Sequence, residues 1–403
     1  RQRQMCIRDR YVMLSKDTFG IDGDDAWKER LAAKRRRDYT IQAVLLLVLF
    51  ALLASAVMNV SENLEARHIR SGFAFISNPA GFDVGETAIA FSSFDPMWKA
   101  FAAGILNTIK ISLYSIVTAT LMGVVVGLMR LSRHPMLRFL GAAHVEVYRN
   151  IPLIVLFLAV YLTVTELLPS ARGALHIGDW VFLSKSGLQY AEPVQALYAT
   201  ISAFGAGVIA ALATYKLLLK RLTSLIASLW GLLALAVVAV VVWVSFGAIG
   251  GWVHPEQTRF ALSGGGQFTP EFLALWLGLT LFTSAAIAEI VRAGVLAVRP
   301  QQWEAGLALG LTRAETVSYV IFPQSMRLVI PPLASQYMNL TKNSSLAVIV
   351  GYPDLVNIGN TAINVSAQAL EVICIIMMVY LTLNLIISVV MNALNARVMR
   401  APQ

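Results

Sequence analysis

Charged side chains are scarce in this chain of 403 residues. Asp, Glu, Lys and Arg make up 14% of it, whereas an average water-soluble domain carries about 25%. So few charges cannot cover a water-facing surface of this size, which excludes an ordinary soluble protein. Hydrophobic residues make up 57%, and several apolar runs reach the roughly 20 residues that cross a bilayer as a helix. The sequence therefore predicts an all-α membrane protein with many spans.

Cysteine and the motifs of common enzymes are sparse or absent. The two cysteines, Cys6 and Cys374, form no disulfide or metal pattern, and the five histidines have no metal-ligand spacing. The phosphate-binding motif G-x-x-x-x-G-K-[ST] is missing, as are H-E-x-x-H and any Ser/His/Asp set. We therefore expect no catalytic residue, no metal site and no cofactor in this chain, and no enzyme activity of its own.

The net charge of +9 does not indicate nucleic-acid binding. Lys and Arg gather in short segments beside apolar runs, without the interleaved aromatic residues of a base-stacking surface. The first ten residues, RQRQMCIRDR, resemble translated adapter sequence, and we expect residues 1–10 to be a sequencing artefact. The alternative is a genuine basic tail.

Eight apolar segments are long enough to be membrane spans. The first follows a polar tail (11–39) that is too long for a signal peptide, and no small-residue cleavage site follows it, so an uncleaved span is favoured. The predicted divisions are the tail, the first span with its outer loop (40–100), the remaining spans (101–395) and a final tail (396–403). The eight spans are 40–58, 101–129, 151–168, 194–215, 225–246, 272–291, 328–350 and 370–394.

The distribution of Lys and Arg predicts the orientation. After residue 10, twenty of these residues fall on the N-terminal side of the membrane and six on the other, while Lys110 and Lys342 fall within spans. Basic loops stay in the cytoplasm. Both termini are therefore expected inside, and segment 292–327 with them.

Segment 289–332, between the sixth and seventh spans, carries the clearest local pattern. Pro300 is typical of a first helical residue, and Gly310 can adopt the left-handed backbone that ends a helix. Thr312 and Glu315 form a T-x-x-E capping box that begins a second helix, which Pro323 is expected to end. Glu289 and Arg292, three residues apart, can form a local ion pair. The local pattern alone fits an interfacial helix pair as well as a docking element.

Within this segment, Glu304-Ala305-Gly306, then Gly310, then Val320-Ile321-Phe322-Pro323, resembles the "EAA" loop of ABC-importer permeases. Gly306, Val320 and Phe322 depart from that pattern, but the spacing is kept. In that family the loop sits in a groove of a cytoplasmic ATPase and transmits its movement to the spans. The resemblance implies that Glu304, Ala305, Gly306, Gly310 and Pro323 belong to such a coupling loop, at 300–323.

Further segments resemble polar amino-acid permeases, including Glu146–Pro152 and Lys342–Leu346. Residue pairs in the first outer loop, the extra first span and the inserted helices at about 194–246 resemble the general L-amino-acid permeases of the Aap/Bzt type. The resemblance implies a type I ABC importer permease core.

The resemblance also implies a function and partners. The chain would be the permease subunit of an ATP-driven importer of polar L-amino acids in a bacterial inner membrane. Its partners would be ATPase subunits that bind ATP and Mg²⁺, a second homologous permease, a periplasmic amino-acid-binding protein and membrane lipid.

The polar run Lys342, Asn343, Ser344 and Ser345 is a candidate for the substrate path. A charge within a span costs at least ~2.5 kcal/mol at the bilayer centre, so it usually faces a cavity or a partner. The alternatives are that Lys342 reaches the outer interface along its alkyl stem or pairs with an acid.

Two other function classes remain open from the sequence. An ion-coupled secondary transporter predicts matching broken spans and intramembrane carboxylates, which do not stand out. The second alternative is a membrane-embedded scaffold that transports nothing.

Overall fold

The computed structural model describes residues 22–66, 72–219, 224–258 and 262–400. The chain divides into two compact units, residues 1–71 and 72–403. In the first unit the described residues form helix α2 (Asp22–Ala66). Its portion Arg36–Ala56 is long and apolar enough to cross a membrane, in agreement with the predicted span 40–58. The predicted artefact, residues 1–10, lies outside the described residues.

Six helices in the described part of the chain, α2 included, have the length and composition of membrane spans. Those of the second unit lie at the predicted spans, and they are α3 (Met97–Leu131), α6 (Ala196–Leu218), α7 (Ser224–Gly250), α8 (Pro270–Leu296) and α13 (Ala369–Arg400). A seventh would be α4 (Pro135–Asn150) with α5 (Leu153–Leu162) and its continuation η2 (Thr163–Leu167), if this pair is one span. The pair bends by 103°, because Pro152 favours an extended Ile151.

The predicted span 328–350 falls in α11 (Phe322–Asn343) and the 3-10 helix η5 (Ser344–Ile349). α11 does not reach the apolarity of the six span helices, since Pro331, Pro332 and several polar residues interrupt it. It instead buries one face in the core that α8 also lines. The polar remainder of α11 is therefore suited to a polar surface rather than to lipid.

The core of unit 72–403 is built around α3 and α8, which lie side by side. Phe272, Leu275 and Ile287 of α8 are fully buried, and α5 adds Phe157. Glycines allow the helix backbones to approach closely. A Cβ atom at Gly123 of α3 would lie 2.6 Å from the Cβ of Ile287.

The inserted helices α6 and α7 pack against each other as a hairpin. Their other faces are exposed: 17% of the span window in α6 and 6% of that in α7 is buried. Apolar side chains cover these faces, as a lipid-facing helix requires.

The outer loops contain short antiparallel strands. A four-stranded sheet has the order β1 (Leu175–Ile177), β2 (Val181–Ser184), β3 (Gly187–Tyr190) and β8 (Gly266–Phe268). Two further pairs are β4 (Glu192–Pro193) with β5 (Trp252–Val253), and β6 (Glu256–Gln257) with β7 (Leu262–Ser263). The strands join loops some 80 residues apart in sequence, so local patterns could not predict them.

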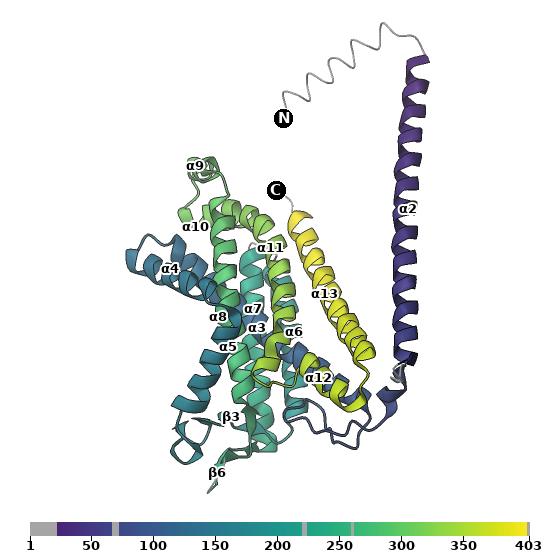
Figure 1. The fold of residues 1–403 in the computed structure, drawn as a ribbon. Helices are drawn as coiled ribbons and strands as arrows, with labels where there is room; N and C mark the ends of the chain where they lie inside the picture. The colour runs from purple at the N-terminus through teal and green to yellow at the C-terminus, as the bar shows by residue number, and fades with distance from the viewer. Residues whose placement is uncertain (1–21, 67–71, 220–223, 259–261, 401–403) are drawn as a thin grey trace. The chain divides into compact units, whose positions relative to one another are not determined.

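The short helices of unit 72–403 lie near its two ends. They are η1 (Phe73–Ser77), η3 (Ala171–Gly173), α9 (Pro300–Ala308), α10 (Arg313–Glu315), the π-helical turn η4 (Thr316–Ile321) and α12 (Leu355–Ser366). Figure 1 shows α9 and α10 at one end of this unit and strands β3 and β6 at the opposite end. The predicted coupling loop and the predicted outer loops that contain these strands therefore lie at opposite ends of this unit.

Candidate functional site

Residues 300–323 fold into a compact unit, here called the knob, at one end of the helices (Figure 1). Helix α9 stops at Gly310, whose φ of 80° lies in the left-handed region predicted for it. The Gly310 N–H donates to the Leu307 carbonyl at 3.0 Å, and the Leu311 N–H donates to the Gly306 carbonyl at 3.2 Å. These two bonds form a Schellman motif, which fixes the turn.

The predicted capping box begins the next helical turn. The Thr312 N–H donates to Glu315 Oε2 at 2.8 Å, and the Glu315 N–H donates to Thr312 Oγ1 at 3.3 Å. Hydrogen bonds from the Thr312 side chain and backbone lower the pKa of the Glu315 carboxyl below its usual value. These local hydrogen bonds therefore fix the start of the second half of the knob.

The prediction that Pro323 ends the second helix is wrong. The chain passes from α10 through η4 into α11 without a break, and Pro323 lies in the first turn of α11. The wider π turn changes the hydrogen-bond spacing just before the proline, so the missing N–H of Pro323 interrupts no regular ladder. As a result, the knob is joined to α11 by a continuous helical backbone.

The two halves of the knob pack against each other through Gly306. This glycine is buried, and a Cβ atom there would lie 2.6 Å from Cγ2 of Thr316. Gln324 Nε2 donates to Gln302 Oε1 at 3.1 Å and ties α9 to the start of α11. Glycine is therefore required at position 306 by the close approach of η4.

The outer surface of the knob presents the other predicted coupling residues. Glu304 and Ala305 are exposed on α9, beside two exposed leucines, Leu307 and Leu309. Leu309 is 81% exposed although it is apolar. An exposed mixture of apolar and charged side chains on a rigid turn is suited to docking a protein.

Helix α11 links the knob to the predicted polar run. Its 22 residues extend over about 33 Å at 1.5 Å per residue. Lys342 and Asn343 form its last turn, and Ser344 and Ser345 begin η5. The two predicted sites therefore lie at opposite ends of one helix, which can transmit movement from one to the other.

Part of the polar run lines a cavity of about 230 Å³. Its walls are Lys342 and Ser345 together with Val356, Ile376 and Tyr380. The run is thus split: Ser344 is fully buried and donates to the Thr341 carbonyl at 2.8 Å, and neither Ser344 nor Asn343 lines the cavity.

Beneath the knob, the predicted Glu289–Arg292 pair is present at 3.6 Å. Glu289 also forms an ion pair with Arg130 at the end of α3. The two arginines share one carboxylate and connect α3 to α8. The partner from α3 lies more than 150 residues away in sequence, which is why the local pattern did not reveal it.

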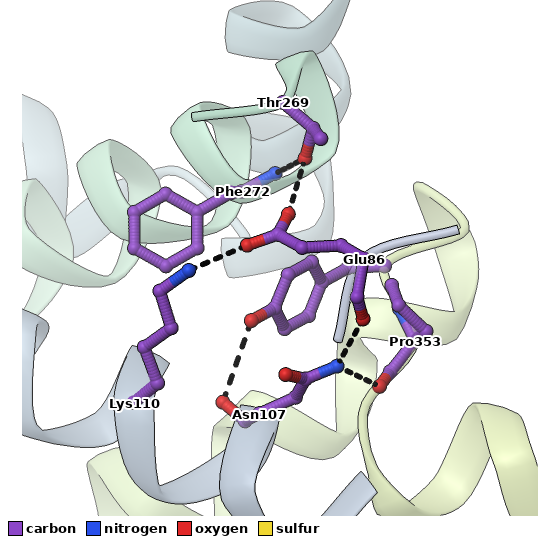
Figure 2. Close-up of polar contacts among 7 residues, drawn as sticks. Glu86, Asn107, Lys110, Thr269, Phe272 and Pro353 are labelled. Carbon is purple, nitrogen blue, oxygen red and sulfur yellow. Dashed lines mark hydrogen bonds and ion pairs between the residues drawn. The ribbon is translucent and has the colours of Figure 1, made fainter. Parts of the chain in front are cut away.

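A cluster around Glu86 was not predicted from the sequence (Figure 2). Glu86 Oε1 accepts a hydrogen bond from Lys110 Nζ at 2.6 Å, and Oε2 accepts one from Thr269 Oγ1 at 2.8 Å. Asn107 Nδ2 donates to the backbone carbonyls of Glu86 and Pro353, at 2.7 and 2.9 Å. One loop residue thereby joins α3, α8 and the chain before α12.

This cluster explains the charge of Lys110 within a predicted span. The ammonium group is neutralised by Glu86 and also lies 4.8 Å from the centre of the Phe272 ring. The lone lysine in an apolar run signalled that a partner was required, but not that a loop residue 24 positions earlier supplies it.

This chain is similar to known proteins over most of its length. Residues 119–400 match the family described as "Binding-protein-dependent transport system inner membrane component". The general L-amino acid transport system permease protein AapQ of Rhizobium johnstonii is 36% identical, over 94% of this chain and 97% of its own length.

Two other relatives are similar over most of their length. The putative amino-acid ABC transporter permease protein YhdX of Escherichia coli is 38% identical, over 84% of this chain and 88% of its own. The glutamate/glutamine/aspartate/asparagine transport system permease protein BztB of Rhodobacter capsulatus is 33% identical, over 90% of this chain and 93% of its own length.

Proposed function

This chain belongs to the family of inner membrane components of binding-protein-dependent transport systems, and we propose that its knob is the element through which a separate ATPase drives it. The chain is the permease subunit of an ATP-driven amino-acid importer. The predicted membrane class, the importer function and the resemblance to Aap/Bzt-type permeases are confirmed by this family match. The cargo proposed for this chain is a broad range of polar L-amino acids.

The observation that carries the coupling role is the rigid build of the knob. Its turn is fixed by Gly310, its second half is fixed by the Thr312–Glu315 box, and its backbone continues into α11. A docked ATPase that moves the exposed face of α9 would move α11 with it. ATP and Mg²⁺ would be bound by that partner chain.

We propose that the polar run at the far end of α11 belongs to the substrate path. Lys342 and Ser345 support this proposal because they line a cavity, whereas Asn343 and Ser344 would serve as supports. Movement of α11 would open and close this region as the permease alternates between its two states.

The proposed assembly contains this chain, a related second permease, two ATPase copies and a periplasmic amino-acid-binding protein. The proposed location is a bacterial inner membrane, with both termini in the cytoplasm. The basic residues on the knob side of the helices support this orientation.

The coupling role can be tested at Gly310. A β-branched residue is strained at a φ of 80°, so Gly310→Val should reduce ATP-dependent amino-acid uptake by at least ~10-fold, on the scale of a rearranged turn. Asparagine tolerates this backbone conformation, so Gly310→Asn should retain most of the uptake. Uptake is measured in proteoliposomes that contain the full complex.

A second variant separates docking from folding. Glu304 is exposed, so Glu304→Lys should weaken co-purification of the ATPase while the permease still inserts normally. Wild-type uptake and co-purification in both Gly310→Val and Glu304→Lys would exclude the coupling role. Uptake that follows an ion gradient without ATP would instead support a secondary transporter.

A further inference from the structure

Helix α4 differs in direction from the spans around it. The chain bends by 103° between α4 and α5. Figure 1 shows α5 continuing toward the outer loops, whereas α4 extends sideways from α3 and α8 at the end that carries the knob. Because α5 lies in the predicted span 151–168, a helix at this angle to it runs close to the plane of the membrane.

The surface of α4 is apolar on one side and basic on the other. Met136, Leu140 and Val147 recur at helical spacing and are exposed; we call them the apolar stripe. Arg138 and Arg149 are also exposed. Each lies two residues from a member of the stripe, which is about 200° around a helix. This arrangement is typical of a helix that lies in a membrane interface.

A third set of residues fixes α4 to the core. Val145 is buried in a cluster with Ala285 and Ala288 of α8, and His144 Nε2 lies 2.9 Å from Ser284 Oγ. Helix α4 is therefore held against α8, while its apolar stripe and its arginines remain on the surface.

Exposed apolar side chains continue from α4 into α5. Val155 and Leu162 are exposed although they lie within a predicted span, where an exposed apolar side chain faces lipid. Only Ile151 and Pro152 separate the two helices. The apolar stripe is thus continuous in the chain with a lipid-facing surface.

The charge of the segment complements an anionic lipid surface. Arg133, Arg138 and Arg149 are accompanied by one acidic residue, Glu146, between residues 133 and 150. Arginine binds phosphate oxygens through paired N–H donors, and each basic residue near an anionic leaflet is attracted to it. Lipid therefore offers acyl chains to the apolar stripe and phosphate groups to the arginines.

We propose that α4 lies in the membrane interface on the knob side and binds anionic phospholipid headgroups through Arg138 and Arg149, with the apolar stripe against acyl chains. Since only a short bend at Pro152 separates α4 from α5, headgroup binding would fix the angle at which that span enters the membrane. The inference depends on the membrane class of the chain and not on its cargo or on the ATPase.

Photocrosslinking tests which molecule covers α4. Phe139, between the two faces, is 68% exposed and is replaced by photoreactive p-benzoylphenylalanine. The full permease–ATPase complex is placed in vesicles of equal parts phosphatidylglycerol and phosphatidylcholine. Mass spectrometry should find lipid adducts at this position, with phosphatidylglycerol in at least ~5-fold excess, as expected for arginines at an anionic surface. Adducts mainly to the ATPase or a second permease, or equal yields of the two lipids, would overturn the inference.

Charge variants test the arginines. Arg138→Gln combined with Arg149→Gln should lower the excess to less than ~2-fold, whereas Arg138→Lys with Arg149→Lys should retain most of it. Lys185→Gln is the matched control, because Lys185 is an exposed cation of an outer loop, and it should leave the excess unchanged. An excess that persists in the glutamine pair, or equal losses in the glutamine and lysine pairs, would refute a charge contact at α4.

These outcomes are separate from those of the proposed function, because crosslinking requires no transport. A wild-type complex that shows no ATP-dependent uptake would refute the proposed function, while the adducts would still decide the role of α4. If uptake occurs but the adducts show no preference for the anionic lipid, only the lipid-binding role of α4 is refuted.

Discussion

Asp354 illustrates how burial changes the chemistry of one side chain. It caps the start of α12, where its Oδ1 accepts the Asn357 N–H at 2.8 Å, and it is fully buried. Burial raises the pKa of its carboxyl to about 7, although hydrogen bonds from the backbone and Tyr380 act in the opposite direction. The folded protein therefore favours the protonated acid more than the unfolded chain does.

This shift predicts that stability falls with rising pH. The unfolded carboxyl releases its proton near pH 4 and the folded one near pH 7, so between these values the folded state holds the extra proton and loses stability as pH rises. The thermal midpoint of the detergent-solubilised protein should be lower at pH 8 than at pH 5, by roughly 2–4 °C for each kcal/mol lost.

Asp354→Asn provides the control, because asparagine caps helices as well as aspartate and does not titrate. Its midpoint should depend less on pH than that of the wild type. Asp354→Ala should be less stable at both pH values by about 1 kcal/mol through loss of the cap. An unchanged pH dependence in Asp354→Asn would assign the slope to other groups.

Among the helices, the contact between α3 and α8 depends on the absence of a side chain at Gly123. A Cβ atom there would also lie 2.9 Å from the Ser284 carbonyl oxygen. This oxygen belongs to the backbone of α8, so it cannot relieve the clash by a change of rotamer. The Glu289–Arg130 pair joins the same two helices near one end. Toward the other end the loop residue Glu86 bridges them, because it pairs with Lys110 of α3 and accepts a hydrogen bond from Thr269 at the start of α8. Together these contacts hold α3 and α8 as one rigid pair.

We expect Gly123→Ala to destabilise this pair by about 1–3 kcal/mol, the usual effect of overpacking. Gly205 in α6 is the matched control, since a Cβ atom there meets nothing within 4 Å. Gly205→Ala should leave stability unchanged or slightly higher. The measurement is the fraction of monodisperse protein that remains after heating, and equal losses in both variants would contradict the packing argument.

For the whole chain, the main asymmetry lies along the axis of the helices in unit 72–403. The knob lies at one end, and the strands of the outer loops lie at the other (Figure 1). Basic residues near the knob, such as Arg130 and Arg292, contrast with the acidic Glu86 and Asp95 before α3. This asymmetry supports the orientation proposed above from the positive-inside rule, with the knob in the cytoplasm.

Labelling with a membrane-impermeant thiol reagent tests this orientation. Leu309 in the knob is 81% exposed and Phe94 in the outer loop is 88% exposed, so cysteines introduced at these positions should react readily. In a chain whose Cys6 and Cys374 are replaced by serine, Leu309→Cys should react only in inverted vesicles. Phe94→Cys should react in spheroplasts, and the reverse pattern would invert the proposed topology.

Patterns within short stretches of sequence were enough to predict the membrane class, the spans of α3, α8 and α13, and both ends of the knob turn. The hydropathy of the spans, the left-handed backbone at Gly310 and the Thr312–Glu315 capping box each depend on residues close together in the chain. They can therefore be predicted without knowledge of the tertiary structure. Pro323 was misread because a π turn relieves the usual conflict between proline and a helix.

Folding alone brought together residues that are far apart in the chain. The Glu86–Lys110–Thr269 cluster joins positions up to 183 residues apart, and the small sheet joins two outer loops. The apolar run around Lys110 signalled that this lysine required a partner, but only the packing of the helices and loops placed Glu86 beside it. The apolar segments of the sequence determined the spans. Contacts among the spans and their loops, which form only when the chain folds, determined which residue neutralises the charge of Lys110.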